Sequence, residues 1–223
     1  MKVRSWYASL TAALMLLVPV AAQAAVKLPA IFGDHMVLQR EMPIPVWGWD
    51  ASGTEVTVSI GDASAKAKAD ADGKWMVKLP AMSAGGPLEV KVAGSSEVTF
   101  KDVLVGEVWL CSGQSNMEWT VSRSNNPSEE AAAAKHPKIR HIKIPHVPAD
   151  SPQDNVAAGP WEVCTPQTVP NFTAVGYYFG RELQKELDVP IGLIGSNWGG
   201  TRVEPWTPPS GFKAVPALKD IAG

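Results

Sequence analysis

A serine between two amides stands in a polar turn that follows an apolar run, and its type and position suit nucleophilic chemistry. The stretch is "GEVWLCSGQSNMEW", Gly106 to Trp119, in which Ser115 lies between Gln114 and Asn116. A glycine at position 113 permits a tight turn, after which Ser115 would open the next segment. Free backbone N–H groups at such a bend can stabilise the oxyanion of an acyl-transfer reaction. The spacing is compatible with a nucleophilic serine and equally with a simple polar turn after a strand.

The residues around Ser115 exclude one well-known hydrolase motif. The elbow of α/β-hydrolases needs a glycine two residues after the serine, where this chain has Met117. A general base would also be needed, and the histidines of the sequence are His35, His136, His141 and His146. We interpret each histidine as structural or solvent-facing. A catalytic Ser115 therefore requires a different class of hydrolase.

Three runs that are shorter and more uniformly apolar than the strands expected in the first half predict buried parallel strands in the second half of the chain: residues 102–111, 138–144 and 190–195. Between the second and third runs, apolar residues recur at helical spacing, which predicts a helix from Thr173, its N-cap, to Leu187. Alternation of strand and helix indicates an α/β layer architecture. Because ligands bind beyond the carboxyl ends of such strands, Ser115 follows the first strand at a suitable place for chemistry.

Two further segments complete the second half. "SEEAAAAK" predicts a short helix capped by Ser128 and ended by Pro137. The segment from Pro145 to Pro170 is rich in proline and polar residues and predicts a long, ordered surface loop. Loops of that length are uncommon without a function.

The first half has a different pattern. From Val26 to Phe100, short runs of β-branched and aromatic residues alternate with turn signals, which predicts a small antiparallel sandwich. We expect a β-sandwich-like domain over residues 25–102 and an α/β domain over 103–223. Three tryptophans of the first domain, Trp47, Trp49 and Trp75, are expected in its core rather than as platforms for sugars.

The N-terminus predicts export. Lys2 and Arg4 precede an apolar run, and small residues at Ala22 and Ala24 suit a secretory signal peptide over residues 1–24, with cleavage after Ala24. No later segment approaches the roughly 20 apolar residues of a membrane span. The mature chain would carry 18 bases and 22 acids, a formal charge of −4, which disfavours a nucleic-acid partner.

The two cysteines would meet an oxidising compartment after export. Cys111 and Cys164 could form one disulfide, although the sequence alone does not show that they are close. Their spacing fits no zinc-binding pattern.

Four blocks of sequence carry a resemblance to a known family. "IFGDHMVLQREMPIPVWGW", "GEVWLCSGQSNMEW", "NFTAVGYYFGREL" and "IGLIGSNWGGTRVEPWTP" appear in this order. Together they resemble the sialate O-acetylesterase family of the SGNH-hydrolase superfamily. The implied fold is a small N-terminal β-sandwich-like domain followed by the first part of a three-layer α/β/α hydrolase domain.

The resemblance implies a secreted or periplasmic serine esterase that removes O-acetyl groups from carbohydrates, with no metal or organic cofactor. Ser115 matches the nucleophile, and Gly176 and Asn197 match the other oxyanion donors. Residues expected to contact substrate are Gln114, Trp198, Gly199, Gly200, Arg202 and Glu204. Gly199 and Gly200 are also alternative backbone donors to the oxyanion. For the last loop an alternative stays open, in which Arg202 and Glu204 pair with each other and the tryptophans pack at the domain junction.

The sequence departs from the family in one respect. The family takes its general base from an Asp-x-x-His motif late in the domain, and no histidine follows His146 here. We therefore expect the catalytic histidine beyond residue 223 and a chain that is a truncated part of a longer enzyme. The alternatives are a carbohydrate-binding module without enzymatic activity and an inactive remnant.

Overall fold

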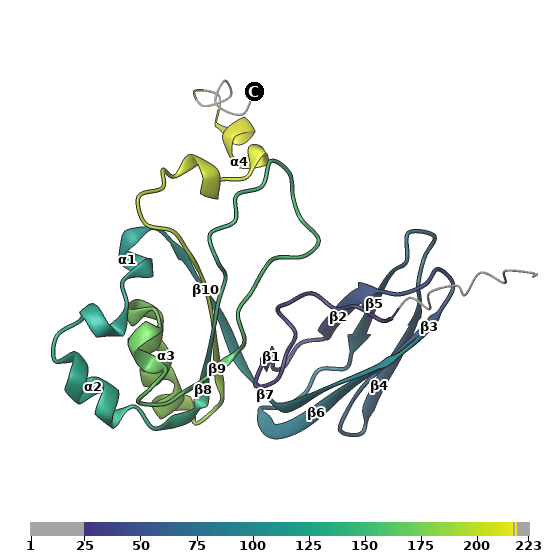
Figure 1. Ribbon diagram of the computed structural model, residues 1–223, viewed down its shortest axis with the longest axis horizontal. Helices are drawn as coiled ribbons and strands as arrows, with labels where there is room; N and C mark the ends of the chain where they lie inside the picture. Colours follow the sequence, from purple (N-terminus) through teal and green to yellow (C-terminus); the bar gives the residue numbers. More distant parts are fainter. Residues whose placement is uncertain (1–24, 216, 218–223) are drawn as a thin grey trace, which may run out of the picture.

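The computed structural model describes residues 25–215 and 217, so the expected signal peptide lies outside the described residues. The chain folds into a β-rich part and a mixed part of strands and helices, which lie side by side (Figure 1).

The β-rich part consists of two facing sheets. Its strands are β1 (Val37–Gln39), β2 (Ile44–Trp49), β3 (Glu55–Ile60), β4 (Ala63–Lys68), β5 (Lys74–Leu79) and β6 (Gly85–Ala93). Strands β2 and β5 form an antiparallel ribbon. In the other sheet the strands lie in the order β4, β3, β6 and β7 (Glu97–Gly113). In β3 and β5 every second residue is buried, as a sheet with one face on a core requires. The predicted sandwich is therefore present, although the sequence did not indicate β1 or β4.

Strand β7 belongs to both parts. Its first section pairs with β6 in antiparallel and with β1 in parallel, and Glu107–Gly113 pairs in parallel with β10 (Ile191–Asn197). Residue 102, where we expected the domains to meet, lies inside this continuous strand. One strand therefore fixes the serine turn to the β-rich part.

The mixed part contains the predicted parallel strands. β10 lies between β7 and β8 (His136–Lys143) and is parallel to both, while the short β9 (Glu162–Cys164) is antiparallel at the edge. The helices are α1 (Ser115–Glu118), α2 (Pro127–Ala133), α3 (Ala174–Leu187) and α4 (Pro209–Ala214). Single turns of 3-10 helix lie at Val121–Arg123, Val169–Asn171 and Glu204–Trp206. The α/β architecture is confirmed.

The helix starts agree with the sequence in one case and differ in the other. Thr173 caps α3, since its Oγ1 accepts a hydrogen bond from the N–H of Gly176. Helix α2 begins at Pro127 after Asn126, not after Ser128, and ends at Ala133. Proline presets the φ angle of a first helical turn and needs no N–H acceptor there, so the helix begins two residues earlier than it would with Ser128 as its N-cap.

The two faces of the parallel sheet have different coverings. Helices α1, α2 and α3 lie on one side, where Phe172, Tyr177 and Leu193 are fully buried (Figure 1). Side chains of the other face, among them Ile142 and Trp161, join the core of the β-rich part. In the part of the chain that the structure describes, no helix has the length and apolar character to cross a membrane.

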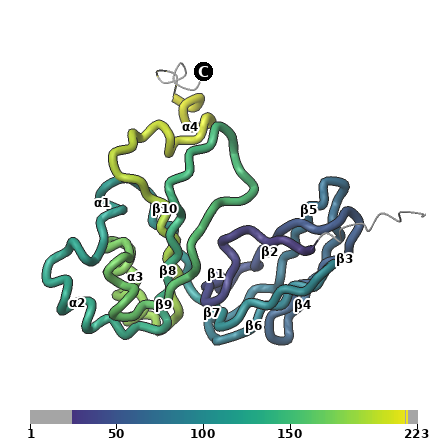
Figure 2. Tube along the Cα trace, viewed as in Figure 1, coloured from purple at the N-terminus to yellow at the C-terminus, as the bar shows by residue number. Residues whose placement is uncertain are grey.

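The loop between β8 and β9 reaches the β-rich part. In Figure 2 it is the long green excursion between these two strands. Trp161 donates from Nε1 to the carbonyl of Ile31 at 2.8 Å, and Asn155 Oδ1 accepts from the N–H of Ala30 at 3.0 Å. A salt bridge joins Lys74 to Asp154 at 2.6 Å. The loop is therefore ordered by contacts far away in the sequence.

Candidate active site

Ser115 stands at the carboxyl end of β7, where the sequence placed it. It is exposed, it is the first residue of α1, and Gln114 is the N-cap of this short helix. Gly113 has a φ angle of +137°, a region that favours glycine and allows the chain to leave the strand abruptly. Within the described residues no hydrogen bond engages the Ser115 hydroxyl, so it is accessible to a ligand.

The exit of β10 packs directly against the serine turn. The N–H of Trp198 donates to the carbonyl of Gly113 at 2.9 Å. A Cβ at position 199 would lie 3.4 Å from the Cα of Ser115 and 2.6 Å from Oε2 of Glu118, so only glycine fits without a shift. The structure thus brings Trp198 and Gly199 against the serine turn, and their expected contact with substrate stays a prediction.

Glu118 joins the serine turn to two neighbours. Its Oε2 accepts a hydrogen bond from the N–H of Gly199 at 2.6 Å, and its Oε1 lies 2.9 Å from Nε2 of His146. The same Nε2 lies 2.9 Å from the carbonyl oxygen of Asn197. Because both partners are acceptors, Nε2 carries the hydrogen and Nδ1 is the basic nitrogen. The sequence did not indicate this position for His146.

The ring of His146 is held in place by stacking. It lies parallel to the indole of Trp198, with 4.3 Å between centroids and 6° between planes. Trp198 therefore has a defined role as a support for His146. The Gly199 N–H is already used by Glu118, which argues against our alternative that it donates to an oxyanion.

Asn197 is buried beneath the serine turn, with 3 % of its surface exposed. Its Nδ2 donates to the carbonyl of Cys111 at 3.1 Å, and its Oδ1 accepts from Nζ of Lys143. Burial lowers the pKa of Lys143. An amide nitrogen has two hydrogens, and Cys111 accepts one of them, so the Asn197 amide keeps a second N–H without an acceptor among the described residues.

The N–H of Gly176, which we expected to donate to an oxyanion, is engaged by a neighbouring side chain. Gly176 is buried in the first turn of α3, and its N–H donates to Thr173 Oγ1 at 3.5 Å. A Cβ there would lie 2.7 Å from the sulfur of Cys111. The structure therefore gives Gly176 a packing and capping role and does not bring it into contact with Ser115.

The loop after β10 holds the remaining residues expected to bind substrate. Gly200 and Arg202 are exposed, and the described residues contain no ion pair between Arg202 and Glu204. Glu204 has a buried carboxylate oxygen, Oε2, without a hydrogen-bond partner in this part of the chain. Trp206 donates from Nε1 to Thr201 Oγ1 at 2.8 Å. The side chain of Gln114 is exposed beside Ser115.

A polar cavity of about 390 Å³ opens at the same edge of the sheet. Its lining consists of Glu118, Thr120, Arg123, His141, Lys143, Glu162, Asn171, Thr173 and Asn197. Burial raises the pKa of Glu162. The cavity therefore contains carboxylates, cations and amides within reach of the serine turn.

The other histidines have positions that suit structural roles. His141 is 2 % exposed, stacks on Phe172 with 4.6 Å between centroids, and has a pKa that burial lowers to about 3, so it is neutral. His136 begins β8, at the opposite end of the sheet from Ser115. His35 pairs with Asp102 at 2.7 Å in the β-rich part.

Both cysteines are free and buried in the structure. Cys111 lies on β7 and Cys164 on β9, and burial raises the pKa of these thiols to about 11 and about 12. The disulfide that we considered from the sequence is not formed.

An exposed serine at the carboxyl edge of a parallel sheet, beside a buried asparagine, defines a candidate serine hydrolase of the α/β class. A sequence model described as "Carbohydrate esterase, sialic acid-specific acetylesterase" matches residues 105–216, half of the chain. The chain belongs to this family, which confirms the resemblance of the four blocks.

Curated proteins similar to this chain are named sialate O-acetylesterases. The sialate O-acetylesterase of Mus musculus is 39 % identical over 161 residues, and that of Homo sapiens is 37 % identical over 153 residues. The matches cover 66 % and 63 % of this chain but only 30 % and 29 % of the relatives. The crystal structure of a carbohydrate acetylesterase from Xanthomonas citri is similar, with a TM-score of 0.81 and 42 % identity over 83 % of this chain and 43 % of that one.

Proposed function

We propose that this chain carries the nucleophilic portion of an exported carbohydrate O-acetylesterase, with Ser115 as nucleophile. The observation that carries the proposal is the exposed Ser115 at the carboxyl end of β7, in contact with the exit of β10. Sialate O-acetylesterase and carbohydrate acetylesterase are the names of its relatives, which supports acetyl esters of sugars as substrates.

The reaction is acyl transfer in two steps. Ser115 Oγ attacks the acetyl carbonyl while a general base takes its proton, and the tetrahedral intermediate expels the sugar alcohol. Water then attacks the acetyl-serine and releases acetate. The backbone N–H of Ser115 and the remaining N–H of the Asn197 amide are suited to stabilise the oxyanion, because Asn197 is already fixed by Cys111 and Lys143.

Two sources of the general base follow from the sequence and the geometry. The first is the Asp-x-x-His motif that the family resemblance implies. Among the described residues, His146 is the histidine bound to the serine turn, and its Nδ1 is the basic nitrogen. Replacement of His146 by alanine distinguishes these sources, since only the second makes activity of this chain depend on it.

The proposed substrate is tested by acetate release. The mature chain from Ala25 is incubated with O-acetylated sialic acid and with acetylated xylan, beside the variant Ser115→Ala. Release from either sugar that the variant abolishes supports the proposal and identifies the substrate. The proposal is wrong if, with imidazole added as an external base, the mature chain and Ser115→Ala release acetate from both sugars at the same rate.

The proposal that the protein is exported is based on the signal-peptide pattern of residues 1–24. Expression of the whole chain in a Gram-negative host should give a periplasmic protein that begins at Ala25, as N-terminal sequencing would show. An unprocessed cytoplasmic product that still begins at Met1 would contradict export.

A further inference from the structure

Two tryptophans of the β-rich part lie outside its core. In β2 the buried residues Val46 and Gly48 alternate with Trp47 and Trp49, which are half-buried on the outer face of the ribbon. Of the three tryptophans that we expected in the core, only Trp75 is buried, with 3 % exposed. The period of two along a strand explains the difference, because residues 47 and 49 share the face opposite to the core.

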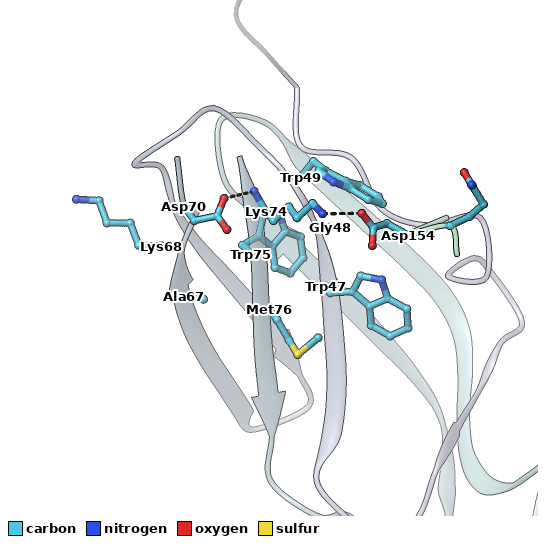
Figure 3. Close-up of a pocket in the computed structure, with 11 residues that line it drawn as sticks. Trp47, Gly48, Trp49, Ala67, Lys68, Asp70, Lys74, Trp75, Met76 and Asp154 are labelled. Carbon is cyan, nitrogen blue, oxygen red and sulfur yellow. Dashed lines mark hydrogen bonds and ion pairs between the residues drawn. The ribbon is translucent and has the colours of Figure 1, made fainter. Parts of the chain in front are cut away.

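A pocket of about 600 Å³ includes these indoles. Figure 3 shows Trp47 and Trp49 near each other, with Met76 and Lys74 from the neighbouring strand β5. The register places Met76 opposite Trp47 and Lys74 opposite Trp49. Met76 is 55 % exposed, so the apolar floor is open to solvent.

The long loop before β9 supplies one wall of this pocket. Asp154 pairs with Lys74 at 2.6 Å, and Gln153 lies beside it in the lining. On the other side Asp70 accepts a hydrogen bond from the backbone N–H of Lys74 at 2.8 Å. The loop before β9 therefore contributes part of the lining of this pocket.

The chemistry of the lining favours a sugar. The faces of the indoles offer flat apolar surfaces on which the C–H face of a pyranose ring can stack. Around them stand two carboxylates, two ammonium groups and an amide, from Asp70, Asp154, Lys68, Lys74 and Gln153. The charges of these groups balance, and sugar hydroxyls both donate and accept hydrogen bonds. A ligand with a strong charge of one sign would meet no excess of the opposite charge in this pocket.

We propose that this pocket binds a neutral sugar unit of a polysaccharide, at a site in the β-rich part that does not involve Ser115. The site would hold a polymeric substrate on the enzyme while acetyl groups are removed elsewhere on the molecule. Binding needs neither a nucleophile nor a general base, so it can be tested whether or not the chain is an esterase.

Affinity electrophoresis in native gels tests the proposal. The gels contain deacetylated xylan, galactomannan or mixed-linkage β-glucan, and a gel with polysialic acid provides an acidic comparison. The chain from Ala25 should be retarded by at least one neutral polysaccharide. The double variant Trp47→Ala/Trp49→Ala should bind at least about tenfold more weakly, and Asp154→Ala about threefold more weakly.

Two control variants separate the possible causes. Trp109→Ala removes another exposed indole, 42 % exposed on β7 and outside the pocket, and should bind like the original chain. Ser115→Ala should also bind normally, even if it removes all esterase activity. Circular dichroism of each variant establishes that it is folded, and Asp154→Ala removes one exposed side chain together with its salt bridge to Lys74.

Three results would overturn the proposal. The first is migration without retardation in all three neutral gels. The second is unchanged binding by the folded double variant or, if that variant does not fold, by Asp154→Ala. The third is retardation by polysialic acid alone, which would indicate a charge effect.

Discussion

Glu118 is the residue that fixes the serine turn to its surroundings. One carboxylate oxygen accepts from the Gly199 N–H and the other contacts His146, so a single side chain connects α1, the exit of β10 and the segment after β8. Its partners could not be predicted, because they are 28 and 81 residues away along the chain.

Removal of the Glu118 carboxylate should loosen this connection. Glu118→Ala leaves the Gly199 N–H without its acceptor and removes one of the two acceptors of His146 Nε2. We expect a loss of about 1–2 kcal/mol in the free energy of unfolding, measured with urea. The matched variant Glu118→Gln retains an acceptor oxygen and should lose less. Equal stability of Glu118→Ala and the original chain would show that the contact is of no energetic consequence.

The two thiols should be unreactive in the folded protein. Burial raises the pKa of Cys111 to about 11 and that of Cys164 to about 12, so little thiolate exists near pH 8. We expect iodoacetamide to modify both only after denaturation, as intact mass spectrometry would show. A mass two hydrogens lower, with no alkylation even in denaturant, would reveal a disulfide and contradict the free thiols of the structure.

At the scale of elements, Thr173 couples two helices. Its Oγ1 donates to the carbonyl of Met117 in α1 at 2.5 Å and accepts from the Gly176 N–H of α3. A sequence pattern identified the cap of α3, because capping is a local interaction. The hydrogen bond from Thr173 to Met117 in α1 joins residues that are 56 positions apart, so no local sequence pattern could predict it.

Two substitutions at position 173 test this coupling. Thr173→Ala removes both hydrogen bonds and should reduce the free energy of unfolding by about 1–2 kcal/mol. Thr173→Ser keeps the hydroxyl and should lose clearly less. If serine and alanine are equally destabilising in thermal unfolding, the methyl group rather than the hydroxyl is the important contact.

The elements that the sequence predicted are those with strong local patterns. The parallel strands contain short apolar runs, although β8 also carries His, Lys and Arg, and α3 has a clear period and a cap, so these elements were predicted correctly. Strand β4, "ASAKAK", consists of residues that are rare in strands, and the three-residue strands β1 and β9 are too short to show a period. Their pairing with β3, β7 and β8 respectively, rather than a pattern of their own, defines these three strands.

At the scale of the whole molecule, Asp102 joins the two parts. Its Oδ2 accepts from Nη1 of Arg140 at 2.8 Å and contacts Nδ1 of His35 at 2.7 Å. Arg140 is 4 % exposed and lies on β8, whereas His35 belongs to the β-rich part. The continuity of β7 through Asp102 makes this contact possible. A boundary placed at residue 102 from composition alone could not show that the strand is shared.

The Asp102 contact should make stability depend on acid pH. The hydrogen bond from Arg140, with a smaller effect of His35, holds the pKa of Asp102 below its ordinary value of 3.8, although burial opposes this. Stability from a lowered carboxyl pKa is present above the ordinary value and is lost as the pH falls through the folded-state value. We expect Asp102→Asn to lose about 1–2 kcal/mol near neutral pH.

The pH dependence separates this electrostatic effect from simple packing. The difference in unfolding free energy between the original chain and Asp102→Asn should shrink as the pH falls below about 3.8. A difference that stays constant from neutral to acid pH would indicate that Asp102 acts through shape alone.

The most direct test of the central claim is covalent labelling of Ser115. The folded chain is treated with a fluorophosphonate in the presence of imidazole as an external base, and the adduct is located by peptide mass spectrometry. A nucleophile at the carboxyl end of β7 predicts one adduct, on Ser115, that is absent from Ser115→Ala and from the denatured chain. No adduct on Ser115, or the same labelling in the denatured chain, would contradict the assignment of Ser115 as the nucleophile.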